Sequence, residues 1–313
     1  MGPQGTLDWP LRRALQLRAD APAIVDGQRR FSYADLARRT AGLSSGLRSL
    51  GLSSGDRVAA LAYNSFRHLE LWMGVPPANL VVNDLNFRLA VPELEFILND
   101  SGARALVTDR AHWEHADELR GRCPALEALV WADEGPAPGE AVHWDDVCAA
   151  EPLPVDHPEL AAISGDTLAA ISYTGGTTGR PKGVMQTHGN LVANAKHTLL
   201  QNPLHVTDRF LHSSPMFHAA GVANIYGLTW VAGTHVIAPG FEPAAFGRIV
   251  EDERVTVAVL VPTMLNMLLN HPGTAARDLS SWRLLIYAAS PMPIGLLRRH
   301  STPCRAISPR GTA

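Results

Sequence analysis

The chain has 313 residues, of which 46% are hydrophobic, enough to bury a sizeable core in one large or two modest domains. Its 27 basic and 30 acidic residues give a net charge of −3 without any basic run, so we expect no binding to nucleic acid or to an anionic membrane. The three cysteines form no CxxC pattern, the N-terminus has no secretory signal, and no apolar run is long enough to span a bilayer. We therefore expect a cytoplasmic protein without a disulfide framework, a cysteine zinc site or a transmembrane segment.

Strand and helix patterns alternate along the first half of the chain. Ser32 begins a Ser-x-x-Asp capping pattern and Gly51 ends the apolar spacing, which predicts a helix between them. Further runs predict strands at 57–62, 79–85, 103–109 and 126–133, and helices at 66–75 and 91–100. The proline-rich, polar stretch at 149–166 is interpreted as a linker between two lobes.

The same alternation continues through the second half. An apolar, partly β-branched strand is predicted at 167–172, and a helix at 185–201 follows the glycine-rich stretch between them. Later strands are predicted at 208–214, 233–239, 255–261 and 283–289, with helices at 219–231, 243–253 and 263–270. This rhythm predicts an α/β fold of mostly parallel sheets covered by helices.

The stretch YTGGTTGRPKGV at 173–184 concentrates small hydrogen-bond donors after a buried strand. Glycines let backbone N–H groups approach an anion, hydroxyls add donors, and Lys182 supplies a positive charge, so a polyphosphate cradle is predicted. It is not a Walker A loop, because two residues separate Gly179 from Lys182 and Gly183 stands where a magnesium-binding hydroxyl is required. An ordinary surface turn rich in glycine and threonine is the alternative.

This stretch resembles, position by position, the signature of the adenylate-forming superfamily, which includes acyl-CoA synthetases, luciferases and the adenylation domains of peptide synthetases. PMFHAAG at 215–221 is similar to the family segment that walls the acyl pocket, and LLIYAASPMP at 284–293 to the segment facing adenine and acyl group. The resemblance implies the fold of the large N-terminal domain of these enzymes.

The resemblance also implies a two-step reaction. A carboxylate attacks the α-phosphate of ATP to form an acyl-adenylate and release pyrophosphate, and the thiol of coenzyme A then displaces AMP. ATP, Mg²⁺ and coenzyme A are the implied cofactors, with Mg²⁺ bridging phosphate oxygens. The implied phosphate-binding residues are Thr174, Gly175, Gly176, Thr177, Thr178, Gly179 and Lys182.

On the acyl and adenine side, the resemblance implies His218 as the catalytic residue. The other residues implied on this side are Phe217, Gly221, Ala288, Ala289 and Ser290. Ala-Ala-Ser departs from the Gly-Gly-Ala often found at this point in the family, although small residues are retained. No protein ligand to a metal is expected, because the histidines nearest to these segments have no metal-ligand spacing: His188, His197, His205 and His212.

The resemblance ends near Arg299. We interpret 1–299 as an incomplete N-terminal AMP-binding domain with the C-terminal domain missing, and 300–313 as an aberrant tail, with a frameshift after Arg299 as the hypothesis. The predicted activity is that of an acyl-CoA synthetase acting on a fatty acid, and the 313-residue form is expected to be inactive. A peptide-synthetase-type adenylation domain and a catalytically dead fragment that binds nucleotide or acyl group are the alternatives. The expected partners are a small carboxylic acid, ATP and coenzyme A, and a homodimer is left open.

Overall fold

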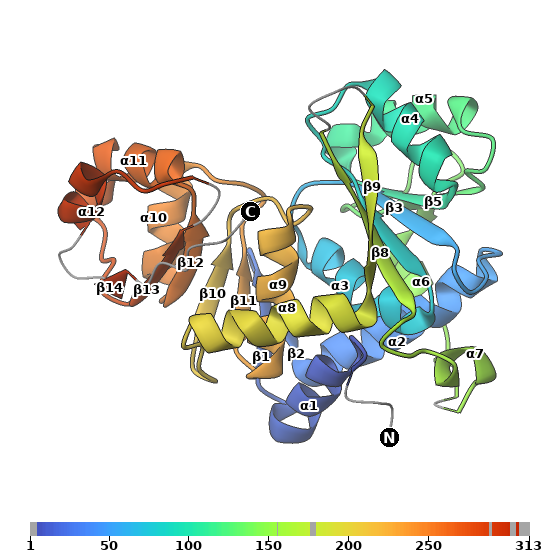
Figure 1. The fold of residues 1–313 in the computed structure, drawn as a ribbon, viewed down its shortest axis with the longest axis horizontal. Coiled ribbons are helices and arrows are strands. Elements are labelled where there is room, and N and C mark those ends of the chain that lie inside the picture. Colours follow the sequence, from blue (N-terminus) through green and yellow to red (C-terminus); the bar gives the residue numbers. More distant parts are fainter. Residues whose placement is uncertain (1–4, 155, 176–179, 288–289, 301–304, 307–313) are drawn as a thin grey trace. The chain divides into compact units, whose positions relative to one another are not determined.

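The computed structural model describes residues 5–154, 156–175, 180–287, 290–300 and 305–306. The chain forms two units, and the described residues of each contain a seven-stranded sheet (Figure 1). Unit 1 comprises Met1–Arg12, Ala34–Tyr63 and Arg67–Asn194, and unit 2 comprises Arg13–Tyr33, Asn64–Phe66 and Ala195–Ala313.

The sheet of unit 1 has the strand order β7-β6-β5-β3-β4-β8-β9, and every neighbouring pair is parallel except β8 and β9. Its strands are β3 (Arg57–Leu61), β4 (Val81–Asp84), β5 (Ala103–Thr108), β6 (Ala128–Trp131), β7 (Val142–His143), β8 (Leu168–Thr174) and β9 (Lys182–Thr187). Its helices are α2 (Tyr33–Ser49), α3 (Phe66–Gly74), α4 (Val91–Ser101), α5 (Trp113–Arg122), α6 (Trp144–Cys148) and α7 (Pro158–Ala161). The 3₁₀ turns Pro76–Ala78 and Arg110–His112 complete the unit.

The helix α4 packs against the sheet of unit 1 through one apolar stripe. Leu94, Ile97 and Leu98, spaced as one face of a helix, are buried together with residues of β3, β5 and β6. The left-handed Gly102 ends α4, so the chain turns directly into β5. This places the opposite stripe of α4 outside the core, where it can meet other segments of the unit.

The sheet of unit 2 has the order β14-β13-β12-β10-β11-β1-β2, with only β1 and β2 antiparallel among the described strands. Its strands are β1 (Pro22–Asp26), β2 (Arg29–Ser32), β10 (Arg209–His212), β11 (Thr234–Ile237), β12 (Val257–Leu260), β13 (Leu284–Tyr287) and β14 (Arg305–Ala306). Its helices are α9 (Ala219–Trp230), α10 (Pro243–Asp252), α11 (Pro262–Asn270) and α12 (Ile294–His300), with a 3₁₀ turn at Thr274–Ala276. Helices α1 (Trp9–Arg18) and α8 (His188–Gln201) are shared between the units.

Alternation along the strands of unit 2 gives the sheet two apolar faces. On β12, Ala258 and Leu260 join a core with α10 and α11, whereas Val257 and Val259 join a second core with Leu228 of α9. Successive side chains of a strand point to opposite faces, so helices cover both sides of this sheet. The predicted α/β fold of mostly parallel sheets covered by helices is therefore confirmed.

One predicted element is wrong. The helix expected at 185–201 begins only at His188, and the residues before it form β9, antiparallel to β8. β9 lies at the sheet edge with four of its six residues exposed, so it lacks the buried alternation by which a strand is recognised. The stretch 149–166 lies within unit 1, and the chain passes to unit 2 between Asn194 and Ala195.

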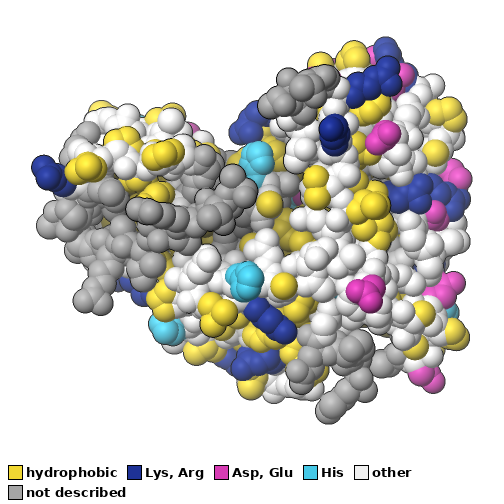
Figure 2. All heavy atoms as spheres, in the orientation of Figure 1, with side chains coloured by type: hydrophobic (Ala, Val, Ile, Leu, Met, Phe, Trp, Pro, Cys, Tyr) yellow, Lys and Arg dark blue, Asp and Glu magenta, His cyan; other side chains and the backbone are white. Residues whose placement is uncertain are grey.

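On the face drawn in Figure 2, basic and acidic side chains are interspersed outside the grey atoms. Among the described residues, no helix has both the length and the apolar character required to cross a bilayer.

Candidate functional site

The predicted phosphate loop joins the two strands of a hairpin. Thr174, the last residue of β8, pairs with Lys182, the first residue of β9. The ammonium-bearing side chain of Lys182 is exposed, so it is available to a ligand. Thr174, Gly175 and Lys182 are thus placed at the ends of this loop, whereas the predicted residues Gly176, Thr177, Thr178 and Gly179 lie outside the described residues.

The hairpin changes the electrostatic argument for this loop. A helix beginning directly after the loop would direct its N-terminal N–H groups and dipole at an anion. Helix α8 instead begins at His188, six residues after Lys182, and β9 lies between them. The positive charge that the described residues offer here therefore comes from the side chains of Lys182 and Arg180 rather than from a helix dipole.

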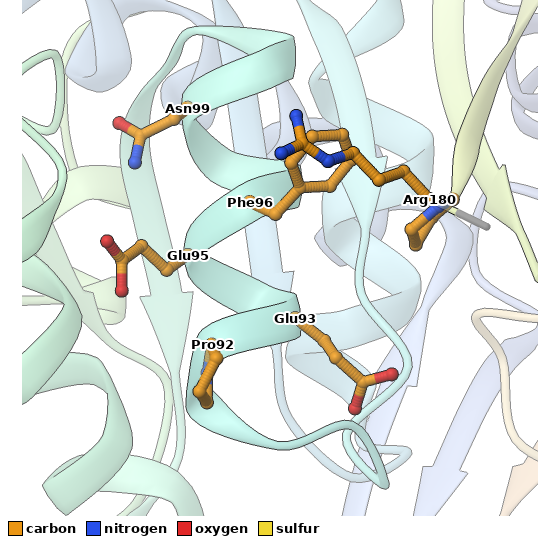
Figure 3. Close-up of a pocket in the computed structure, with 7 residues that line it drawn as sticks. Pro92, Glu93, Glu95, Phe96, Asn99 and Arg180 are labelled. Carbon is orange, nitrogen blue, oxygen red and sulfur yellow. The ribbon is translucent and has the colours of Figure 1, made fainter.

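Both arms of the hairpin contact helix α4. Before the loop, the Tyr173 hydroxyl donates a hydrogen bond of 2.6 Å to Asp100 Oδ2. At the end of the loop, two residues before β9, the Arg180 guanidinium carbon lies 5.3 Å from the centre of the Phe96 ring, and Figure 3 shows its side chain reaching across that ring. A groove of about 560 Å³ runs along this contact, lined by Pro92, Glu93, Glu95, Phe96, Asn99, Arg180 and Pro181.

The predicted acyl-side residues form a turn that leads into α9 in unit 2. His218 is the N-cap residue of α9 with extended backbone angles, and its carbonyl oxygen accepts a hydrogen bond of 2.8 Å from the Gly221 N–H. The Phe217 and His218 rings lie 4.2 Å apart between centroids. Met216 is fully buried, but the His218 side chain is exposed. The turn therefore anchors itself with Met216 and presents an imidazole outward.

Asn64, which the sequence reasoning missed, holds this turn in place. It is 3% exposed, and its Oδ1 accepts the Met216 N–H at 2.8 Å. Its Nδ2 lies 2.9 Å from the Ser214 carbonyl oxygen, 3.2 Å from that of Ala238 and 3.3 Å from that of His212. One buried amide thus joins the ends of β10 and β11 to the start of the turn. The local sequence offers little signal for this role beyond a polar residue shortly after the predicted strand at 57–62.

Gly221 is required in this turn by a close backbone approach. A Cβ at this position would lie 3.0 Å from both Cα and the carbonyl oxygen of Met216. A side chain would therefore push the first turn of α9 away from the buried methionine. Of the predicted adenine-side residues, Ser290 is described and exposed, whereas Ala288 and Ala289 lie outside the described residues.

Two buried histidines of unit 2 form a hydrogen-bonded chain. His212 Nε2 lies 2.9 Å from His235 Nδ1, and His235 Nε2 lies 3.0 Å from Thr229 Oγ1, whose hydroxyl is 2.8 Å from the Ile225 carbonyl oxygen. Burial lowers the pKa of His212 to about 3, and burial together with the neighbouring His212 lowers the pKa of His235. Both imidazoles are therefore neutral structural groups at neutral pH.

The pKa values of two buried histidines of unit 1 are shifted in opposite directions. His188 Nδ1 accepts a hydrogen bond of 3.1 Å from the Leu7 N–H, and burial lowers the pKa of this histidine to about 4. His68 Nε2 lies 2.7 Å from Asp84 Oδ2. Burial opposes the charge of His68, but the Asp84 carboxylate outweighs burial and raises the pKa of His68. Within the described residues, no group of three or more His, Cys, Asp or Glu side chains is arranged to hold a metal ion.

The described site residues offer two kinds of chemistry. In unit 1, a hydroxyl, a backbone amide and an ammonium stand at the ends of one loop, a donor set suited to phosphate oxygens. In unit 2, an aromatic ring and an exposed imidazole stand on a rigid turn, a set suited to an organic acid.

Comparison with known proteins identifies relatives of this chain. The family model described as AMP-binding enzyme matches residues 11–307. A feruloyl-CoA synthase from an Amycolatopsis species is 39% identical over 302 residues, which cover 95% of this chain and 57% of that protein. A long-chain-fatty-acid–CoA ligase from Thermus thermophilus is 33% identical over 273 residues, 86% of this chain and 49% of the relative. The chain thus spans about half the length of these curated relatives.

Solved structures share the fold. The N-terminal domain of FACL13 from Mycobacterium tuberculosis superposes with a TM-score of 0.84 at 25% identity, covering 97% of this chain and 75% of that one. An anthranilate CoA ligase, AuaEII, solved in complex with anthranoyl-AMP, has a TM-score of 0.88 at 24% identity and is covered over 58% of its length. At this identity the second likeness concerns the fold alone.

Proposed function

Because the chain belongs to the family of AMP-binding enzymes, we propose that the whole protein activates a carboxylic acid with Mg–ATP and transfers the acyl group to coenzyme A. In the first step a carboxylate oxygen forms a bond to the α-phosphorus, and the bond from that phosphorus to pyrophosphate breaks. In the second step the coenzyme A thiolate forms a bond to the acyl carbon and AMP leaves. The observation that carries the proposal is the family match over residues 11–307, which includes the donor-rich loop.

The phosphate-binding role belongs to the hairpin of unit 1. Two anions meet in the first step and a polyanion leaves, so positioning and charge stabilisation are the main requirements. We assign the Thr174 hydroxyl, the Gly175 amide and the Lys182 ammonium to the β- and γ-phosphates. Gly176, Thr177, Thr178 and Gly179 complete this proposed cradle. Mg²⁺ enters with ATP, because such ions are commonly held through substrate phosphates rather than an all-protein cage.

The acyl-side role belongs to the turn of unit 2. We assign Phe217 to the wall of the acyl pocket and His218 to the neighbourhood of the reacting carboxylate. Gly221 permits the close approach of α9 to the turn. Ser290, with Ala288 and Ala289, is assigned to the adenine side, where small side chains leave space for a base.

The proposed acid is a fatty acid, because the segments PMFHAAG and YAASPMP are similar to those of acyl-CoA synthetases, and an aromatic acid is the second candidate, which the identities favour. The feruloyl-CoA synthase, named for an aromatic acid, is 39% identical to this chain, against 33% for the ligase named for long-chain fatty acids. Parallel assays with a long-chain fatty acid and ferulic acid separate the two.

We also propose a cytoplasmic location, since the cysteines form no disulfide pattern. The homodimer is a prediction that light scattering can test.

Lys182 provides the direct test of the nucleotide site. The chain contains only one other lysine, Lys196, whose ammonium lies 5.5 Å from the centre of the Trp230 ring, so Lys196→Met is a matched control. We expect Lys182→Met to weaken Mg–ATP binding about tenfold or more in calorimetric titration, as expected for a lost charge-assisted contact. Lys196→Met should bind like the original chain. Equal affinity in all three proteins would refute the assignment.

Acid-dependent exchange of pyrophosphate into ATP tests the chemistry separately. Exchange that requires the acid supports an adenylating enzyme. Nucleotide binding without exchange under any acid favours the alternative of a binding fragment.

A further inference from the structure

Helix α4 carries two side chains that contact the hairpin on either side of the predicted phosphate loop. Phe96 and Asp100 are four residues apart and therefore lie on the same face of the helix, one turn from each other. Leu94, Ile97 and Leu98 form the buried stripe of α4, whereas Phe96 is partly buried against the edge of that core and Asp100 is exposed. Their partners are Tyr173, the next-to-last residue of β8, and Arg180, two residues before the start of β9.

The first contact fixes the end of β8. Tyr173 pairs with Gly183 across the hairpin, and a Cβ on Gly183 would lie 3.1 Å from Tyr173 Cζ and 3.3 Å from its hydroxyl oxygen. The tyrosine ring thus lies over the backbone of β9, in space that only a glycine leaves open. From there the hydroxyl reaches Asp100 Oδ2 at 2.6 Å. Burial, and then the hydrogen bond to Asp100, raise the pKa of Tyr173, so the hydroxyl keeps the proton that it donates.

The second contact fixes the start of β9. The Arg180 guanidinium is stacked 5.3 Å from the centre of the Phe96 ring, within the range of a cation–π interaction (Figure 3). Pro181 follows directly and restricts the backbone of Arg180 to extended angles. The arginine side chain and the chain direction into Lys182 are therefore set together.

We propose that α4 positions the phosphate-binding hairpin, with Asp100 holding its first arm through Tyr173 and Phe96 holding its second arm through Arg180. The two contacts keep Thr174 and Lys182 paired on a strand pair that lies at the exposed edge of the sheet. A loop held in its binding conformation loses less entropy when a ligand binds, so affinity rises without any new ligand contact. This inference rests on the proposed function, since it names nucleotide as the ligand of the hairpin.

The groove beside these contacts is not itself assigned a ligand, because its acidic groups already have partners. Glu93 Oε2 accepts the Ala90 N–H at 2.9 Å and so caps the start of α4. Glu95 accepts a hydrogen bond of 3.2 Å from Arg122. Asn99 lines the same groove from an exposed position and provides a control residue on the same helix.

A double-mutant cycle on the first contact is the primary test. Tyr173→Phe and Asp100→Ala each remove the same hydrogen bond, so each should raise the Kd for Mg–ATP three- to tenfold in calorimetric titration. The double variant should bind no more weakly than the weaker single variant, and Asn99→Ala should bind like the original chain. Additive losses, or unchanged affinity in both single variants, would show that the bond does not position the loop.

The second contact needs a variant that spares the arginine. Phe96→Leu removes the ring but keeps the Arg180 charge, and we expect it to raise the Kd three- to tenfold. If Arg180 acted only as a phosphate ligand, Phe96→Leu would leave the Kd unchanged, which would overturn the role of Phe96.

Hydrogen exchange separates this inference from the proposed function. We expect Tyr173→Phe and Asp100→Ala to accelerate amide exchange in β9 at least fivefold without nucleotide, whereas Asn99→Ala leaves it unchanged. Should the original chain bind no ATP, the proposed function fails, and exchange in β9 still decides whether α4 holds the hairpin. Unchanged exchange in both variants would refute the clamp even where ATP binds.

Discussion

The hairpin of unit 1 and the turn before α9 in unit 2 carry the two groups of predicted site residues, and they are held in contrasting ways. The hairpin lies at a sheet edge, where Val184 is 47% and Met185 71% exposed. The turn is anchored by Met216, which is fully buried, and by Asn64, which is 3% exposed. Backbone groups at the hairpin can be hydrated, but those at the turn have to be matched by protein partners.

From this difference we expect stability to depend mainly on the residues around the turn and ligand affinity mainly on those of the hairpin. Around the turn, a lost partner leaves buried carbonyl or N–H groups unsatisfied, so substitutions should lower the free energy of unfolding. At the hairpin, water replaces the lost partner, so substitutions should mainly change ligand affinity.

Acidification should produce the largest difference between the units. Burial lowers the folded-state pKa values of His212 and His235 of unit 2, to about 3 for His212. When the pH is below the pKa of an unfolded histidine, these two side chains therefore bind protons in the unfolded chain but not in the folded one. The free energy of unfolding is therefore unaffected by these histidines above about pH 6.5 and decreases as the pH falls from there toward the folded-state pKa. Between pH 7 and pH 5 we expect a loss of about 2 kcal/mol for each histidine.

Unit 1 should respond less to the same change. His188, with a pKa lowered to about 4 by burial, loses stability as the pH falls. His68 has the opposite sign, because its raised pKa gives stability that is fully present below the unfolded value and lost as the pH rises through the folded value. Urea unfolding at pH 7 and pH 5 should show a smaller pH-dependent loss in the His212→Gln/His235→Gln variant than in His188→Gln. Identical pH dependence in the original chain and both variants would contradict this.

Replacement of Asn64 should have the next largest effect. Asn64→Ala leaves the Met216 N–H and the carbonyl groups of Ser214 and Ala238 without this partner inside unit 2, so we expect a loss of about 3 kcal/mol in the free energy of unfolding. Urea unfolding measures this loss. Asn266→Ala, at an exposed position on α11, should cost less than about 0.5 kcal/mol, and equal losses in the two variants would argue against the bridging role of Asn64.

A methyl group at Gly221 should cost somewhat less. Its Cβ would lie 3.0 Å from the Met216 carbonyl oxygen, so α9 has to shift, and we expect Gly221→Ala to destabilise the protein by about 2 kcal/mol. Gly240→Ala is the matched control, because no atom lies within 4 Å of a Cβ there. Thermal unfolding of both variants checks the prediction, which is wrong if Gly221→Ala and Gly240→Ala have the same melting temperature.

Tyr173→Phe should have the smallest effect on stability. The hydroxyl contact to Asp100 is close to solvent, so its loss should cost about 0.5 kcal/mol in urea unfolding. The same variant is expected to weaken Mg–ATP binding, which would set the hairpin apart from the turn. A stability loss as large as that of Asn64→Ala would remove the contrast between the two regions.

The sequence alone predicted the fold class and most strands, because apolar alternation and glycine or proline breaks are local signals. It also indicated the two site segments, through the donor-rich stretch before Lys182 and the Phe217–His218 pair, both of which have described residues at the expected strand end and turn. It failed at β9, since an exposed edge strand carries no buried alternation, and the helical spacing from Leu191 onward extended the predicted helix too far.

Only the tertiary structure showed how the two site segments are held. Asn64 is followed in the chain by almost 150 residues before its first partner, and Asp100 by more than 70 before Tyr173. A hydrogen bond between such distant residues depends on the sheet order that brings their strands and helices together. Local sequence determines which elements form and which residue types they offer, but the satisfaction of buried polar groups is a property of the packed chain.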